Sequence, residues 1–316
     1  MPNKISIQEL VDHVQLKVHY GHEFLTNRYI SVLDISRPGL ELTGYFEHYS
    51  PQRIQLFGKA EISFAEKMEP SKLSSVMDKI GSESTPCFVI SSKLTVPEAF
   101  LSVAKKKHIP ILLSDQHTSR VLTDIVSYLS DALAERQAIH GVLVNINGLG
   151  VLISGDSGIG KSEAALELIR RGHRLVSDDR VDVYQRDNNT LMGESPDILE
   201  HLMEIRGIGI IDVMNLFGAG AIQKRCEIKF IVHLQRWVDE KDDFDRLGGN
   251  NKYQRILNVD IPQIIIPVKP GRNLAIIIES AAMNYHAKSM GFNATEVFND
   301  NLTKLIKKNT EDKDNA

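Results

Sequence analysis

A glycine-rich run lies between an apolar stretch and a helix-like stretch, and it narrows the possible folds more than any other segment. Residues 155–162 read Gly-Asp-Ser-Gly-Ile-Gly-Lys-Ser, after the apolar residues 151–153 and before a helical pattern at 163–169. Glycines let such a loop curl until several backbone N–H groups point inward, and the following helix turns the positive end of its dipole toward the same anion. The order strand, loop, helix is typical of a P-loop, so we expect a bound nucleotide polyphosphate.

Within such a loop, the lysine neutralises the outer phosphates and the hydroxyl after it binds Mg²⁺. Here these residues are Lys161 and Ser162. The residues predicted to bind the nucleotide are Gly155, Asp156, Ser157, Gly158, Ile159, Gly160, Lys161 and Ser162.

Composition excludes several broad classes of protein. The chain has 316 residues and a formal net charge of -4 without a basic block, which argues against a general binder of nucleic acid or of membrane surfaces. No apolar run in the sequence reaches membrane-spanning length. Only Cys87 and Cys226 are present, too few for a disulfide framework, so we expect a cytoplasmic protein. The length suggests two domains.

The first domain is predicted to be an α/β domain of residues 1–132. Apolar runs at 86–90 and 109–113 flank a helical stretch at 97–107. Such a crossover usually joins parallel strands. The lysine triplet 105–107 is expected to be the solvated end of this helix.

The second domain is predicted to span residues 133–309, followed by a disordered charged tail at 310–316. It opens with apolar runs at 142–146 and 150–153, joined across Asn147-Gly148, which is a strong hairpin signal. A hairpin that leads straight into a P-loop predicts a mixed sheet. Further strands are expected at 174–177, 181–185, 226–234 and 263–266, and further helices at 274–290 and 295–308. A helix at 118–136 is expected to close the first domain.

Phosphoryl transfer also needs a carboxylate for the metal and a base for the proton of the acceptor. Asp178 and Asp179 end a predicted strand at a point where the chain could return beside the P-loop. One carboxylate could bind Mg²⁺, while the other, next to a like charge, could have a raised pKa and act as the base. A turn with two solvated acids is the alternative.

Three later segments combine charged residues with glycine or proline. Residues 204–212 read Glu-Ile-Arg-Gly-Ile-Gly-Ile-Ile-Asp, which fits either a loop that approaches a ligand or a tight turn between strands. Residues 244–249 include Arg246, which could fold over the phosphates, and residues 267–272 form a turn with two cations. By composition alone, the last two segments would be ordinary surface loops.

Taken together, these segments resemble those of the HPr kinase/phosphorylase family. The glycine-rich loop, the paired aspartates, the run 204–212 and the segment 267–273 all match, and the run 204–212 is far more specific than the P-loop. The resemblance covers essentially the whole chain, although its distinctive motifs lie in the second domain. It implies an α/β protein whose C-terminal kinase domain has a mixed sheet and is similar to the nucleotide domain of phosphoenolpyruvate carboxykinase.

The resemblance also implies an activity. Enzymes of this family use ATP or pyrophosphate to phosphorylate a regulatory serine of the phosphocarrier protein HPr, and thereby control carbon catabolite repression. They remove the phosphate by phosphorolysis, in which inorganic phosphate is consumed and pyrophosphate is formed. The expected cofactors are therefore ATP and Mg²⁺. The expected partners are HPr, inorganic phosphate, pyrophosphate and further copies of the chain in a homohexamer, with neither nucleic acid nor membrane among them.

Individual roles follow from the same resemblance. Asp179 is the expected base, and His140 matches the active-site histidine of the family. Lys161 and Arg246 would stabilise negative charge on the transferred phosphoryl group.

The remaining roles concern the metal and the reverse reaction. Ser162 and Glu204 would bind Mg²⁺. The segment 267–272 would matter mainly for dephosphorylation, although Lys269 stands where the family more commonly has arginine.

Two other functions stay open. A small-molecule P-loop kinase or carboxykinase-like enzyme is one, although a carboxykinase should carry its own metal-binding histidine and lysine near the site, and the sequence shows no convincing set. A non-catalytic nucleotide-sensing regulator is the other, in which Asp178 and Asp179 would only hold Mg²⁺.

Overall fold

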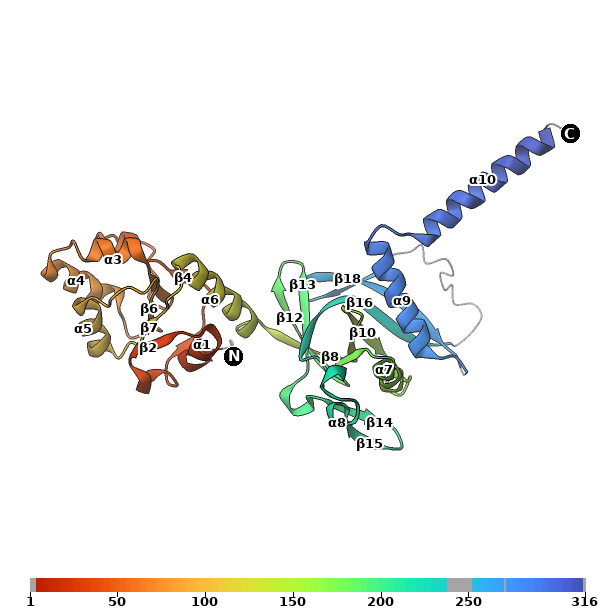
Figure 1. Ribbon diagram of the computed structural model, residues 1–316, viewed down its shortest axis with the longest axis horizontal. Coiled ribbons are helices and arrows are strands. Elements are labelled where there is room, and N and C mark those ends of the chain that lie inside the picture. Colours follow the sequence, from red (N-terminus) through yellow and green to blue (C-terminus); the bar gives the residue numbers. More distant parts are fainter. Residues whose placement is uncertain (1–3, 238–251, 270, 315–316) are drawn as a thin grey trace. The chain divides into compact units, whose positions relative to one another are not determined.

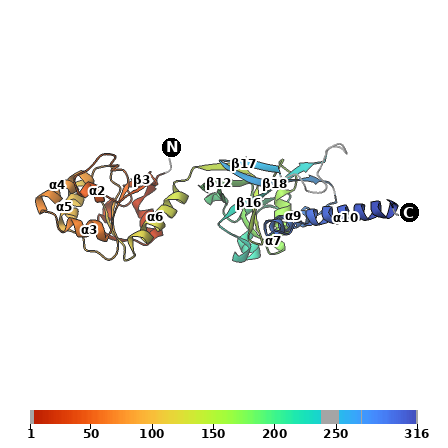
Figure 2. The same cartoon turned by 90° about the horizontal axis from the view of Figure 1, so that it is seen from above.

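The chain folds into two compact units, residues 1–135 and 136–316, which are described separately. The structure is a computed structural model that describes residues 4–237, 252–269 and 271–314, with side chains as far as residue 306 (Figures 1 and 2). The division falls where the last helix of unit 1 ends and the first strand of unit 2 begins. None of the described helices has the length and apolarity needed to cross a bilayer.

Unit 1 is built on a sheet of order β2-β7-β6-β5-β4, in which β4 to β7 run parallel and β2 is an antiparallel edge strand. Strands β1 and β3 pair antiparallel and form a separate two-stranded sheet. The strands are β1 (Ile5–Ser6), β2 (Lys17–Tyr20), β3 (Tyr29–Ile30), β4 (Ile35–Ser36), β5 (Ile54–Phe57), β6 (Phe88–Ile90) and β7 (Ile111–Leu113). The helices are α1 (Ile7–Val14), α2 (Gly39–Leu42), α3 (Lys59–Ala65), α4 (Pro70–Ile80), α5 (Glu98–Lys107) and α6 (Thr118–Ala132), with a 3₁₀ turn at His22–Phe24.

Both faces of the central strands of this sheet are buried, which explains why β6 and β7 are continuous apolar runs. Phe57 and Phe88 pack with α2, α3, α4 and α5 on one face. Leu56 and Val89 pack with α1 and α6 on the other. The predicted parallel β-α-β unit is confirmed as β6, α5 and β7.

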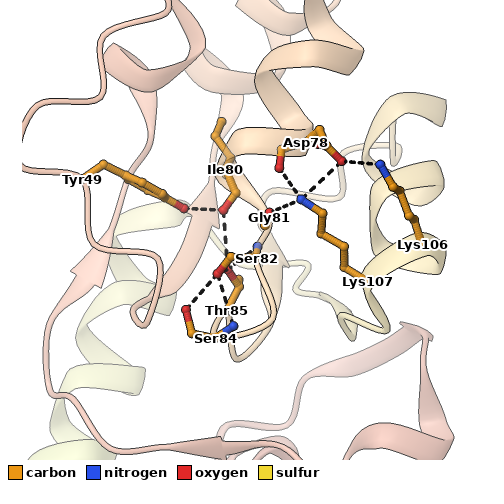
Figure 3. A network of polar contacts seen from close by, with 9 residues as sticks. All are labelled: Tyr49, Asp78, Ile80, Gly81, Ser82, Ser84, Thr85, Lys106 and Lys107. Atoms are coloured by element: carbon orange, nitrogen blue, oxygen red, sulfur yellow. Dashed lines mark hydrogen bonds and ion pairs between the residues drawn. The ribbon is translucent and has the colours of Figure 1, made fainter.

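The C-terminus of α4 is held by side chains from two other segments (Figure 3). The ammonium group of Lys107 donates to the backbone oxygens of Asp78 and Gly81. The Tyr49 hydroxyl donates to the backbone oxygen of Ile80. The last carbonyl groups of a helix have no partner within the helix, so these side chains satisfy acceptors at its end. The Thr85 hydroxyl also donates to the Ile80 oxygen, at 3.5 Å.

The prediction for the lysine triplet is therefore wrong for one of its members. Lys107 is only 19% exposed, whereas Lys106 is 68% exposed and pairs with the Asp78 carboxylate at 2.9 Å. The last lysine points back toward α4, because α4 and α5 pack side by side and the carbonyls of α4 attract a cation.

Unit 2 contains, among the described residues, a nine-stranded mixed sheet of order β11-β9-β10-β16-β13-β12-β8, with β18 beside β16 and β17 beside β18. The strands of unit 2 are β8 (Arg136–His140), β9 (Val142–Ile146), β10 (Leu149–Gly155), β11 (Arg174–Ser177), β12 (Arg180–Asp187), β13 (Thr190–Glu194), β14 (Leu202–Ile205), β15 (Gly209–Asp212), β16 (Arg225–Arg236), β17 (Lys252–Ile256) and β18 (Val259–Val268). Its helices are α7 (Lys161–Arg170), α8 (Val213–Phe217), α9 (Leu274–Ser289) and α10 (Ala294–Asp314), with 3₁₀ turns at Asp197–Leu199 and Ala219–Ala221.

The mixed sheet confirms the fold that the hairpin predicted. β10 and β9 pair antiparallel, with Val151 opposite Val144, whereas β10 and β16 run parallel. Asn147 and Gly148 both have positive φ, at 51° and 90°, as a two-residue hairpin turn requires. Helices α7 and α9 pack together on one face of the sheet, which fixes where the loop after β10 must lie.

Two boundaries differ from the sequence predictions. Helix α6 ends at Ala132, and Arg136 already belongs to β8, where it forms an ion pair with Glu194 at 2.8 Å. The tail predicted to be disordered from residue 310 is helical up to Asp314. Residues 315 and 316 lie outside the described part of the chain.

Candidate active site

One pocket collects most of the residues that the sequence singled out. It lies where the P-loop leaves β10 and enters α7, next to the β11–β12 turn and the β14–β15 hairpin. The residues that line it are His140, Ser157, Gly158, Gly160, Lys161, Ser162, Glu163, Asp178, Asp179, Glu204 and Arg206.

The P-loop can approach β16 closely only because its first residue is glycine. Gly155 has a φ of 137°, and a Cβ at this position would lie 2.4 Å from the backbone oxygen of Leu234. Asp156 and Ile159 belong to the same loop but do not line the pocket, and Ile159 is buried in the core beneath. The loop conformation is thus fixed by backbone geometry and by an apolar anchor.

Lys161 and Ser162 are both held by hydrogen bonds inside the site. Lys161 is 6% exposed, and its ammonium group donates to the backbone oxygens of Gly155 and Asp156, both at 2.9 Å. The Ser162 hydroxyl donates to Asp178 Oδ1 at 2.8 Å. Both donors are therefore engaged with protein oxygen atoms in this structure.

The two adjacent aspartates have different surroundings. Asp178 is buried, and its Oδ2 accepts a hydrogen bond from the Glu204 backbone N–H at 3.1 Å. Burial raises the pKa of the Asp178 carboxyl, while the bonds from Ser162 and Glu204 act in the opposite direction. The sequence had suggested a like-charge neighbour as the cause, but the charge of Asp179 is the smallest contribution here.

Asp179 is the accessible member of the pair. Its side chain is 67% exposed, and its Oδ1 lies 3.1 Å from His140 Nδ1. Its φ is 63°, in the left-handed region that aspartate tolerates better than most residues. Both carboxylates line the pocket, but Asp178 is buried and Asp179 is exposed.

Residues 204–212 form most of the antiparallel hairpin β14–β15, as the alternative of a tight turn between strands predicted. The same segment also reaches the pocket, because Glu204 and Arg206 line it. Met203 and Ile205 are buried in the core, which leaves Glu204 exposed on the other face of β14. Asp212 does not line the pocket. It caps α8 instead, accepting a hydrogen bond from the Asn215 backbone N–H at 3.0 Å.

The other predicted segments contribute less to the described pocket. Arg246 and Pro270 lie outside the described residues. Pro267 and Val268 end β18, and the Lys269 ammonium group stands 3.4 Å from the centre of the Trp237 ring. No residue of the segment 267–272 is among the pocket residues found in the described chain.

Sequence reasoning assigned no role to two of the pocket residues. Glu163 follows Ser162 directly in the first turn of α7, and Arg206 lies in the β14–β15 turn. The position of Glu163 directly after the P-loop could have predicted that it lines the pocket. For Arg206, the sequence could not decide whether its segment was a ligand loop or a plain turn.

Ser162, Asp178 and Glu204 all line the pocket, and each has a side chain with oxygen atoms. The described residues contain no cluster of three or more histidine, cysteine, aspartate or glutamate side chains suited to a metal. Mg²⁺ is typically held by one or two carboxylates together with substrate phosphates and water, so this donor set fits Mg²⁺ better than a dedicated protein-only metal site.

Comparison with known proteins gives a consistent result along the whole chain. Residues 5–129 match the family model described as HPr Serine kinase N terminus, and residues 131–302 match the HPr Serine kinase C-terminal domain.

Similar proteins carry related names. A protein of Levilactobacillus brevis named HPr kinase/phosphorylase is 56% identical over 309 residues, covering 98% of this chain and 99% of that protein. One of Latilactobacillus sakei with the same name is 54% identical over 312 residues, covering 99% of each. The solved Hpr(Ser) kinase/phosphatase of Coxiella burnetii is 38% identical, covers 51% of this chain and 98% of its own, and superposes with a TM-score of 0.46. From the two family-model matches and the full-length relatives, we conclude that this chain belongs to the HPr serine kinase family.

Proposed function

We propose that this chain is a bifunctional enzyme that phosphorylates a serine of the protein HPr and removes the phosphate again by phosphorolysis. The names of relatives that match 98% and 99% of the chain support both activities. The observation that carries the proposal is the exposed carboxylate of Asp179 at the same pocket as the P-loop lysine. A phosphate-binding loop and a base in one pocket are the two requirements for moving a phosphoryl group to a hydroxyl.

In the kinase direction, Asp179 would take the proton of the serine hydroxyl as the serine oxygen attacks the terminal phosphorus of ATP. A new bond forms between phosphorus and the serine oxygen, and the bond from phosphorus to the bridging oxygen of ADP breaks. The contact at 3.1 Å to His140 would hold the carboxylate in position. Lys161 would exchange its two carbonyl partners for phosphate oxygens, and Arg246 would add a second cation.

In the phosphorolysis direction, an oxygen of inorganic phosphate attacks the phosphorus of phosphoserine. The bond to the serine oxygen breaks, pyrophosphate forms, and the serine oxygen regains a proton. Asp179 would first accept a proton from the attacking phosphate and then return it to the serine. The same carboxylate would thus serve both directions, since one is the chemical reverse of the other when pyrophosphate is the donor.

ATP and pyrophosphate are the proposed donors, with Mg²⁺ as the metal. Both donors present a terminal diphosphate to the P-loop, so a pocket that binds phosphates through backbone N–H groups need not distinguish them strongly. Ser162 and Glu204 would hold Mg²⁺ through oxygen atoms. When bound, the metal would neutralise charge on the phosphate oxygens.

We further propose that the chain works as a cytoplasmic homohexamer in the control of carbon catabolite repression. The C-terminal helix α10 supports self-association, because it exposes large apolar side chains. Those more than 40% exposed include Val297, Phe298, Leu302 and Leu305. A second copy of the chain could cover such a face, and light scattering of the purified protein measures the number of copies.

The decisive experiment uses the purified protein, HPr and labelled ATP, followed by inorganic phosphate. We expect label to appear on a serine of HPr and pyrophosphate to form when phosphate is added. Label that stays entirely on ATP would contradict the proposal and favour a nucleotide-sensing regulator. Label transferred to a small molecule but not to HPr would favour a different kinase.

A further inference from the structure

Arg206 occupies a place in the pocket that the mechanism above does not use. It lies in the turn between β14 and β15, and its guanidinium group rests against Gly158 of the P-loop. A Cβ on Gly158 would lie 2.5 Å from Arg206 Nη1 and 2.7 Å from Nη2. The absence of a side chain at Gly158 therefore makes room for the arginine directly over the phosphate-binding loop.

The hydrogen-bonding state of Arg206 differs from that of the other described cation in this pocket. The Lys161 ammonium group donates hydrogen bonds to the backbone oxygens of Gly155 and Asp156. Arg206 forms no hydrogen bond or ion pair with any residue that the structure describes. Guanidinium stays charged at all relevant pH values and carries five donors. Its donors are thus available to an anion without first breaking a contact seen here.

No carboxylate of the pocket, including those of Glu163 and Glu204, forms an ion pair with Arg206 in the described part of the chain. The Asp178 oxygens accept hydrogen bonds from Ser162 and from the Glu204 backbone, and Asp179 faces His140. A surface arginine without a role would not need a glycine beneath it, since it could point into solvent. The close contact of the Arg206 guanidinium with Gly158 and the unused N–H donors of Arg206 both indicate that this residue is positioned to bind phosphate.

We propose that Arg206 is a phosphate-binding residue of this active site, and that it receives the inorganic phosphate that enters for phosphorolysis. The second part rests on the proposed function. Inorganic phosphate has no nucleoside and no second phosphate group, so its binding depends on the few charged donors that it can reach. The planar fork of arginine matches two phosphate oxygens at once. ATP contacts the whole P-loop and should depend less on this single side chain.

The test compares Arg206→Gln and Arg206→Lys with Arg174→Gln, a matched control. Arg174 is exposed and begins β11, at the opposite end of that strand from the pocket. For each full-length variant, the dissociation constant of inorganic phosphate is measured by calorimetry, together with KM for phosphate in phosphorolysis, KM for ATP in the kinase reaction, and Tm.

We expect Arg206→Gln to weaken phosphate binding and to raise KM for phosphate by about tenfold or more, as the loss of a charge-assisted hydrogen bond implies. KM for ATP should change less, and Tm should match the control. Arg206→Lys should fall between the parent and Arg206→Gln, because it keeps the charge but loses the fork. Phosphate constants equal to those of Arg174→Gln would overturn the proposal, and an equal loss for ATP would overturn the preference for phosphate.

The seat on Gly158 has its own test. Gly158→Ala adds a methyl group where the guanidinium lies, at a backbone φ of 75°. If both positions act through the same contact, the double variant should bind phosphate about as weakly as Arg206→Gln alone. Fully additive losses would contradict the seat. Should the parent protein lack phosphorolysis altogether, the proposed function fails, while the calorimetric comparison still decides whether Arg206 binds phosphate.

Discussion

The two neighbouring aspartates should respond to the same substitution in different ways. Asp179→Asn keeps the size of the side chain but removes its ability to take a proton. The Asp179 side chain is 67% exposed and its contact is with a histidine that is 53% exposed. Contacts between exposed charges are worth about 0 to 1 kcal/mol, so the free energy of unfolding should change by less than ~1 kcal/mol.

Catalysis should change far more. A positioned general base typically contributes about 10² to 10⁴ in rate, which corresponds to about 3 to 5 kcal/mol of transition-state stabilisation. We therefore expect kcat for phosphorylation of HPr and kcat for phosphorolysis each to decrease by a factor of about 10² to 10⁴. Binding of ATP and pyrophosphate should survive, because the P-loop itself is unchanged.

Asp178→Asn serves as the matched comparison, since Asp178 is buried and accepts hydrogen bonds from Ser162 and the Glu204 backbone. The amide nitrogen of asparagine cannot accept a hydrogen bond, so only one of these two hydrogen bonds can remain. This variant should therefore loosen the loop and lower the free energy of unfolding by about 1 to 3 kcal/mol. The assays are initial rates in both directions, calorimetric binding of pyrophosphate, and urea unfolding. Full activity of Asp179→Asn in either direction would refute the assignment of Asp179 as the base.

Three further substitutions test other parts of the structure. Gly155→Ala should abolish pyrophosphate binding, because its Cβ would meet a backbone oxygen of β16 at 2.4 Å. Gly172→Ala, where φ is also positive but no atom lies within 4 Å of the added Cβ, is the control for the backbone angle, and equal losses in calorimetry would contradict the clash. Lys107→Met should destabilise unit 1 by about 2 to 4 kcal/mol, because two carbonyl groups at the end of α4 lose their donor. Lys106→Met should cost less than ~1 kcal/mol, because its ion pair is exposed. Hydrogen exchange of the α4 amides measures both effects, and equal protection in the two variants would refute the capping role. Burial raises the pKa of Asp178, so the folded state keeps this proton to higher pH than the unfolded chain does. The free energy of unfolding of the parent, relative to that of Asp178→Asn, should therefore decrease as pH rises above about 3.9 and become constant above the folded pKa. A difference that stays constant between pH 3 and 8 in urea titrations would contradict this linkage.

Local patterns were sufficient for the elements that lead into the site. The strand β11 was predicted with its exact bounds, and the Asn147-Gly148 hairpin was confirmed, because turn chemistry and short apolar runs are encoded within a few residues. The strands β8, β13 and β17 were missed. They are partly polar, and β8 and β13 also pair with strands distant in the sequence, as Arg136 beside Tyr184 shows, which a local window does not contain. β17 pairs with its neighbour β18, but its sequence Lys-Tyr-Gln-Arg-Ile contains no apolar run.

The candidate site shows the same limit at the level of single side chains. The sequence placed Asp178 and Asp179 beside the P-loop, but it could not say which of them is buried. That distinction depends on contacts with Glu204, 26 residues away, and on the left-handed φ of Asp179. Likewise, the contact between Arg206 and Gly158 joins two loops that only the packing of β14 against α7 brings together.

The internal hydrogen bonds of the P-loop have a consequence for how a phosphate enters. Lys161 must release two backbone oxygens before it can bind an anion, and an ammonium group that loses these partners inside a buried loop needs a replacement at once. A phosphate that approaches from the pocket mouth meets Arg206 first, because Arg206 is exposed and Lys161 is buried. The anion can then be held while the lysine exchanges its partners. If this order holds, Arg206→Gln should slow phosphate association as well as weaken binding, whereas Lys161→Met should mainly speed dissociation. Stopped-flow measurement of the two rate constants separates these effects, and an unchanged association rate in Arg206→Gln would show that the arginine does not act first.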